Sequence, residues 1–87
     1  MAEFSLEDLR GVIVSSLGAD SATEISPATA GTSFTDLGLD SLAVYELFIR
    51  IGDERRLQIS DDEIEAAGTP GAAVDLVNTK LAQAASA

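Results

Sequence analysis

The apolar residues of segment 41–56 recur with a helical spacing, and this spacing limits the architectures open to the chain. With successive residues about 100° apart, four apolar side chains gather on one side of a helix. These residues are Val44, Leu47, Phe48 and Ile51. We therefore predict a helix from about Ser41 to Arg56, with this face in a core.

One helix and a long loop are predicted before this segment. Residues 4–17 have Ser5 as an N-cap, and Gly18 ends the helical pattern. The apolar stripe of this helix, at steps of three and four, consists of Leu6, Leu9, Ile13 and Leu17. From residue 19 to residue 39 the composition shifts to Ser, Thr, Gly, Ala and Pro, which indicates a loop. The apolar residues that can anchor this loop to a core are Ile25, Phe34 and Leu37.

Two helices are predicted after the central segment. The run SDDE begins at Ser60 and forms a capping box for a short helix of about residues 61–67. Thr69 and Pro70 are a usual start for a last helix, whose apolar stripe contains Val74, Val77 and Leu81. The expected fold is an all-α four-helix bundle, with three main helices, a short third helix and a long first loop.

The length and charge of the chain restrict its class and its partners. With 87 residues we expect one domain, residues 1–87, with an ordered core of about residues 4–83 and a frayed C-terminal tail. Fifteen acidic residues against five basic ones give a net charge of -10, so nucleic acid and anionic membranes would repel the chain. We expect basic protein partners and a monomer.

The chain contains no cysteine, which excludes disulfides and thiolate metal sites. It also has no apolar run of membrane-spanning length and no signal-peptide pattern at its N-terminus, so we predict a cytoplasmic location.

The run FTDLGLDSL, residues 34–42, delivers a serine to the first turn of the central helix. Gly38 provides a backbone position free of Cβ constraints, and Asp40 can cap the helix. Ser41 then lies where the first amide donors are unsatisfied, so that a phosphate ester there would meet a favourable helix dipole. We predict that Ser41 is a modification site.

Ser41 has two other possible roles. Asp40 and Ser41 could simply start a helix, although a cap does not need the apolar Leu39 and Leu42 beside it. A catalytic serine is disfavoured because the sequence reads GLDSL instead of G-x-S-x-G and contains no histidine to act as a base. No catalytic residue is predicted.

The face of the central helix opposite the core stripe combines apolar and acidic residues. This stripe consists of Leu42, Glu46, Ile49 and Asp53. We interpret it as a docking stripe, in which the acids attract a basic partner and the apolar residues provide short-range contacts. The alternative is a solvated face with isolated apolar residues.

Several other charged and polar residues have predicted roles. Arg50 is expected to pair with Glu46 at i, i+4 spacing. The acids Asp61, Asp62, Glu63 and Glu65 lack the spacing of an EF-hand loop, so we predict no metal site and expect Asp61, Asp62 and Glu63 to extend the docking surface. Asn78 borders the apolar face of the last helix, where its simplest role is that of a surface amide.

Three stretches, LGLDSL, LQISDDE and TPGAAVDLVN, together resemble the acyl carrier proteins. Ala43 after Ser-Leu, the arginines of the second helix and the LEDLR segment are most similar to the discrete carriers of aromatic, type II polyketide synthases. Leu39 departs from the tyrosine often found there, and Leu37 and Gly38 replace the paired glycines usual in peptidyl carriers. The alternatives are a fatty-acid synthase carrier and a helical interaction module that carries nothing.

The resemblance implies a function. Ser41, flanked by Asp40 and Leu42, would receive 4'-phosphopantetheine from coenzyme A through an Mg²⁺-dependent phosphopantetheinyl transferase. The arm would carry malonyl and growing polyketide chains as thioesters, and the chain itself would catalyse nothing. The implied partners are a malonyl transferase, a ketosynthase with its chain-length factor, a ketoreductase and cyclases, and Asn78 with Arg10 would contact the cargo.

Overall fold

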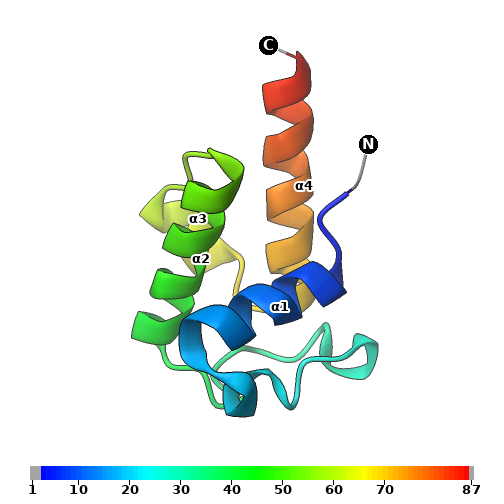
Figure 1. The fold of residues 1–87 in the computed structure, drawn as a ribbon, viewed down its shortest axis with the longest axis vertical. Helices are drawn as coiled ribbons and strands as arrows, with labels where there is room; N and C mark the ends of the chain where they lie inside the picture. The colour runs from blue at the N-terminus through cyan, green and yellow to red at the C-terminus, as the bar shows by residue number, and fades with distance from the viewer. Residues whose placement is uncertain (1–2, 87) are drawn as a thin grey trace.

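Four α-helices carry the fold in a computed structural model that describes residues 3–86 (Figure 1). They are α1 (Leu6–Leu17), α2 (Ser41–Arg55), α3 (Asp61–Ala66) and α4 (Pro70–Ser86). Two short 3₁₀ helices, η1 (Ala19–Ala22) and η2 (Pro27–Thr29), lie in the loop between α1 and α2. The expected all-α architecture, with its short third helix, is confirmed.

The predicted N-terminal caps explain where the helices begin. Ser5 Oγ accepts a hydrogen bond from the amide of Asp8 at 3.1 Å, and Asp8 Oδ2 accepts one from the amide of Ser5 at 2.9 Å. Ser60 and Glu63 form the same reciprocal pattern at α3. At α4, Thr69 Oγ1 accepts a hydrogen bond at 3.1 Å from an amide of the first turn. Each cap satisfies amides that have no partner within their helix.

α1 runs across α2 and α4 and contacts both (Figure 1). The core lies between these three helices. All four residues of the predicted apolar face of α2 are buried. In α1, Leu9 and Ile13 are fully buried as predicted, but Val12 is also buried while Leu6 and Leu17 are half-buried. The buried face of α1 is therefore centred on Leu9, Val12 and Ile13, and the two ends of the predicted stripe lie at its edge.

The core face of α4 also differs from the prediction. Val77 is fully buried, whereas Val74 and Leu81 are only half-buried. The small residues Pro70 and Ala73 take the buried positions near the start of the helix. Small side chains let α4 begin close to the loop, and the amide of Gly71 donates a hydrogen bond to the carbonyl of Ala30 at 2.8 Å.

The long loop is anchored mainly by apolar side chains. Ile25 and Phe34 are buried as predicted, and Leu37 is half-buried. The amide of Phe34 also donates to the carbonyl of Gly68, at the junction of α3 and α4, at 2.9 Å. The 3₁₀ helices of this loop were not predicted, although a proline directly after Ser26 was a visible start signal for η2.

The C-terminal helix continues to Ser86, beyond the end of the ordered core expected near residue 83. Fraying of this end and a single domain over residues 1–87 remain predictions. None of the helices within residues 3–86 combines the length and the apolar character needed to cross a membrane.

Candidate functional site

The last residues of the loop hold the start of α2 in one place. Gly38 adopts φ +90°, a conformation that side-chain-bearing residues rarely take, so the predicted need for glycine is confirmed. Leu39 is 2% exposed, and its amide donates to the carbonyl of Phe34 at 2.9 Å. Asp40 Oδ1 accepts a hydrogen bond from the amide of Ala43 at 2.8 Å. A tight turn, a buried side chain and a cap therefore define the first turn of α2.

Ser41 is the first residue of α2 and is exposed. Asp40 makes the cap, so Ser41 is not needed to start the helix. The amides of the first turn and the positive end of the helix dipole favour an anion at this point. The neighbouring Leu42 is 66% exposed, so an apolar side chain lies at the surface directly beside Ser41. The site therefore fits a serine that carries a phosphate ester.

A groove of about 620 Å³ begins beside Ser41. Phe34 and Leu39 of the loop, Leu42 and Tyr45 of α2, and Ile64 of α3 line it with Ser41. We call it the Ser41 groove. Its volume is in the range of pockets that take small organic molecules, and its lining is largely apolar.

The predicted docking stripe lies on the surface. Leu42 and Ile49 are 66% and 48% exposed, and Glu46 and Asp53 are exposed as well. The apolar and acidic residues are therefore available together along one face of α2. Whether partners dock there stays a prediction.

The predicted pairing of Arg50 with Glu46 is wrong. Arg50 Nε donates to Glu54 Oε2 at 3.0 Å, and the two side chains form an exposed ion pair. Both glutamates lie four residues from Arg50, so spacing alone could not separate them. Glu46 is an exposed acid of the predicted docking stripe.

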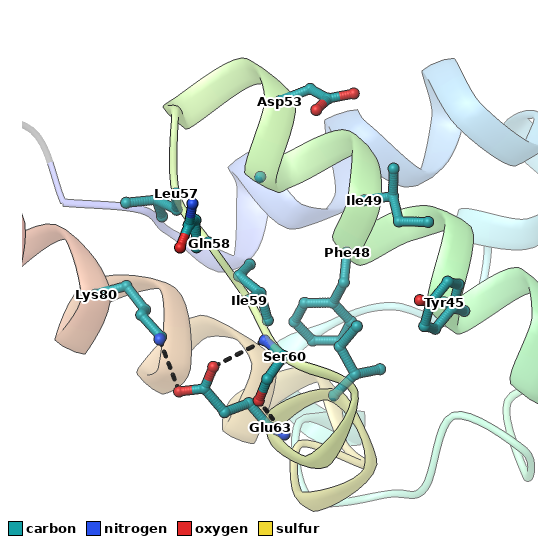
Figure 2. Close-up of a pocket in the computed structure, with 12 residues that line it drawn as sticks. Tyr45, Phe48, Ile49, Asp53, Leu57, Gln58, Ile59, Ser60, Glu63 and Lys80 are labelled. Carbon is teal, nitrogen blue, oxygen red and sulfur yellow. Dashed lines mark hydrogen bonds and ion pairs between the residues drawn. The ribbon is translucent and has the colours of Figure 1, made fainter.

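The acids of α3 differ in their surroundings. Glu63 accepts hydrogen bonds from Lys80 Nζ at 2.8 Å and from the amide of Ser60 at 2.9 Å (Figure 2). The bond from Lys80, followed by the bond from the Ser60 amide, lowers the pKa of Glu63. Glu63 thus joins α3 to α4, while Asp62 is exposed. Within residues 3–86 no three acids are grouped so that they could hold a metal ion.

Asp61, the first residue of α3, accepts a hydrogen bond from the hydroxyl of Tyr45 at 2.8 Å. This bond raises the pKa of Tyr45 above its ordinary value. Sequence reasoning missed Tyr45 as a site residue. An aromatic residue between the core face and the docking stripe of α2 was the only available signal.

The proposed cargo contacts have other partners. Both polar atoms of the Asn78 amide bond to the main chain of Phe4, at 2.8 and 2.9 Å. Arg10 Nε donates to the carbonyl of Ala22 in η1 at 3.3 Å. Asn78 and Arg10 are therefore held by different segments, and nothing in this arrangement joins them in one binding site.

Comparison with known proteins places the chain in a family. Residues 7–77 match the family described as "Phosphopantetheine attachment site". The granaticin polyketide synthase acyl carrier protein of Streptomyces violaceoruber is 36% identical over 98% of this chain and 100% of its own length. An anthracycline acyl carrier protein of Streptomyces peucetius is 39% identical with the same coverage.

Solved structures agree with this assignment. A hexanoyl acyl carrier protein of the actinorhodin polyketide synthase of Streptomyces coelicolor superposes with a TM-score of 0.82 at 34% identity, covering 95% of this chain and 96% of that one. The oxytetracycline acyl carrier protein gives a TM-score of 0.81 at 30% identity, covering 97% and 88%. The chain therefore belongs to the phosphopantetheine attachment-site family and, within it, to the acyl carrier proteins of polyketide synthases.

Proposed function

We propose that the chain carries acyl intermediates of aromatic, type II polyketide biosynthesis as thioesters on a 4'-phosphopantetheine arm attached to Ser41. One observation carries the assignment of this residue: Ser41 is exposed at the first position of α2, while Asp40 supplies the helix cap. This serine lies within the part of the chain that matches the phosphopantetheine family. The bound arm supplies a thiol, a group absent from the chain itself.

The attachment step is a phosphoryl transfer onto Ser41. The Ser41 hydroxyl oxygen attacks the phosphate of coenzyme A that bears the pantetheine, loses its proton and forms a phosphodiester. The leaving group is adenosine 3',5'-bisphosphate, and a phosphopantetheinyl transferase with Mg²⁺ provides the catalysis. The amides of the first turn of α2 favour the charge of the new phosphodiester.

The chain acts in this proposal as a substrate and shuttle for other enzymes. It contains neither histidine nor cysteine, two common groups for acyl transfer, which supports a non-catalytic role. The same proposal includes a cytoplasmic monomer. The enzymes that act on it are the phosphopantetheinyl transferase, the malonyl transferase, the ketosynthase with its chain-length factor, the ketoreductase and the cyclases.

We assign partner docking to the stripe of Leu42, Glu46, Ile49 and Asp53, extended by the acids of α3. The stripe begins one residue after Ser41, where an enzyme that acts on the arm must approach. Asp62 is the best placed of the α3 acids, because Asp61 and Glu63 are already hydrogen-bonded within the domain. A net charge of -10 favours basic partner surfaces.

The alternatives predict different chemistry. A carrier of fatty-acid synthesis would also be pantetheinylated, but a fatty-acid ketosynthase would extend its malonyl form in preference to a polyketide ketosynthase. The granaticin, anthracycline and actinorhodin relatives favour the polyketide pathway. A helical interaction module would accept no arm at all.

The attachment is tested by incubating the protein with coenzyme A, Mg²⁺ and a broad-specificity phosphopantetheinyl transferase, followed by intact mass measurement. Wild type should gain one arm, and Ser41→Ala should gain none while its circular dichroism stays unchanged. Ser15→Ala, at an exposed serine of α1, is the matched control and should be modified like wild type. The proposal is refuted if Ser41→Ala gains the mass of an arm. It is also refuted if wild type gains no mass with a transferase that modifies another carrier protein.

A further inference from the structure

A second groove adjoins the Ser41 groove on the same side of α2. Its volume is about 610 Å³, and it runs between α2, the segment that leads to α3, and α4. Phe48 and Ile49 of α2, Ile59 of the connecting segment and Lys80 of α4 are among the residues that line it. We call it the Lys80 groove. Figure 2 shows it with Tyr45 at one end and Lys80 at the other.

Two residues, Tyr45 and Ile64, line both grooves. Ile64 is 8% exposed and belongs to the core, so its side chain is held in place beneath both grooves. Tyr45 is 39% exposed, and its hydroxyl donates to Asp61 Oδ1 at 2.8 Å. The tyrosine side chain therefore reaches from α2 to the first residue of α3 at the boundary between the grooves.

The hydrogen bond between Tyr45 and Asp61 can position the tyrosine side chain and still be weak enough for a ligand to break it. A hydrogen bond to a carboxylate is stronger than one between neutral groups. At a site open to water, its net contribution to the stability of this arrangement is nevertheless small, since water can replace either partner. An exposed tyrosine held by one such bond can be displaced by a ligand that makes enough apolar contact.

We propose that Tyr45, held by Asp61, separates the two grooves and so limits how far an acyl chain, carried on the arm of Ser41, extends along the protein. This inference rests on the proposed attachment of the arm to Ser41. A short acyl chain lies in the Ser41 groove and leaves Tyr45 in place. A longer chain reaches the Lys80 groove only when the Tyr45 side chain moves away from Asp61.

The consequence is that the domain responds to the length of its cargo. Extension past Tyr45 costs the hydrogen bond to Asp61 and gains contact with accessible apolar residues such as Ile49 and Ile59. Tyr45 is thus a residue that determines chain-length preference and does not touch the reacting thioester.

The test uses the pantetheinylated protein loaded with butyryl or octanoyl groups, and compares the amide chemical shifts of each acyl form with those of its own unloaded form. In wild type, both chains should shift residues of the Ser41 groove and leave Ile59 and Lys80 unchanged. In Tyr45→Ala, the octanoyl chain should also shift Ile59 and Lys80. Tyr45→Phe keeps the ring and removes the hydrogen bond, so its shifts at these residues should be smaller than those of Tyr45→Ala.

Asp61→Ala and Asp62→Ala form a matched pair, since each removes one carboxylate at neighbouring positions of α3 and only the first removes the acceptor of the Tyr45 hydroxyl. Only Asp61→Ala should let the octanoyl chain reach Ile59. Identical octanoyl shifts in wild type and Tyr45→Ala overturn the separation, and identical shifts in the two aspartate variants overturn the role of Asp61. Intact mass shows whether every sample is loaded. A protein that cannot be loaded contradicts the proposed function, whereas a loaded protein without the expected shifts contradicts only the role of Tyr45.

Discussion

The side-chain amide of Asn78 pairs with the main chain of Phe4 through two hydrogen bonds. Oδ1 accepts from the Phe4 amide at 2.8 Å, and Nδ2 donates to the Phe4 carbonyl at 2.9 Å. Phe4 itself is 1% exposed, and the guanidinium carbon of Arg55 lies 4.9 Å from the centre of its ring. The segment before α1 is therefore fastened to α4 by Asn78 and contacts the end of α2 through Arg55.

We expect Asn78→Ala to destabilise the domain by about 1–3 kcal/mol, because it leaves a partly buried amide and carbonyl of Phe4 without their partner. For a domain of this size, each kcal/mol corresponds to a fall of about 4–8 °C in Tm. Thermal unfolding measures the effect. Thr79→Ala, at the exposed neighbouring position, is the control, and equal Tm values for the two variants would contradict the role of Asn78.

Periodicity and capping signals predicted the helices well because both depend on neighbouring residues. The buried face of α2 was predicted completely, and the caps at Ser5, Asp40, Ser60 and Thr69 all form. Ser41 was placed correctly at the exposed start of α2 for the same reason, since a glycine turn and a cap are local features.

Contacts between distant segments could not be predicted in this way. The partner of Asn78 lies 74 residues earlier in the chain and is a main-chain group, which no side-chain pattern reveals. The pairs of Tyr45 with Asp61 and of Glu63 with Lys80 depend on how α3 packs between its neighbours. The residues of these last two pairs line the grooves, so the part of the site beyond Ser41 needed the structure.

The ion pair of Glu63 with Lys80 predicts a pH dependence of stability. The pKa of Glu63 is lower in the folded than in the unfolded protein, mainly because of Lys80, so Glu63 stabilises the fold above the unfolded pKa. This stabilisation is lost as the pH falls through the folded pKa. The Tm of Glu63→Gln should therefore lie below that of wild type near neutral pH, and the difference should shrink below about pH 4.

The control for this pH series is Glu65→Gln, which removes the same charge from α3 and leaves the Lys80 pair in place. It corrects for the change in net charge. A difference between wild type and Glu63→Gln that is the same at neutral and acidic pH would show that the ion pair does not contribute in this way.

The separate roles of Asp40 and Ser41 predict different effects on stability. Asp40→Ala removes the cap of α2 and should cost about 0.5–2 kcal/mol. Ser41→Ala removes an exposed hydroxyl and should change stability by less than about 0.5 kcal/mol. Urea unfolding of the unmodified protein compares them, and Asp40→Asn should restore most of the lost stability. If Ser41→Ala were as destabilising as Asp40→Ala, the serine would be part of the cap.

The docking stripe predicts a salt-dependent loss of association when its charge is reversed. Glu46→Arg should slow association with a basic partner, such as the phosphopantetheinyl transferase, by roughly tenfold at low ionic strength. The reason is that long-range attraction guides the encounter, and added salt should reduce the difference because it screens exposed charges. Asp75→Arg on α4 makes the same change in net charge at another exposed position and should have a smaller effect. Association rates measured by stopped flow distinguish a local charge effect from an effect of net charge. Equal losses of association rate for the two variants would mean that net charge alone attracts the partner. The face of α2 would then be an ordinary solvated surface.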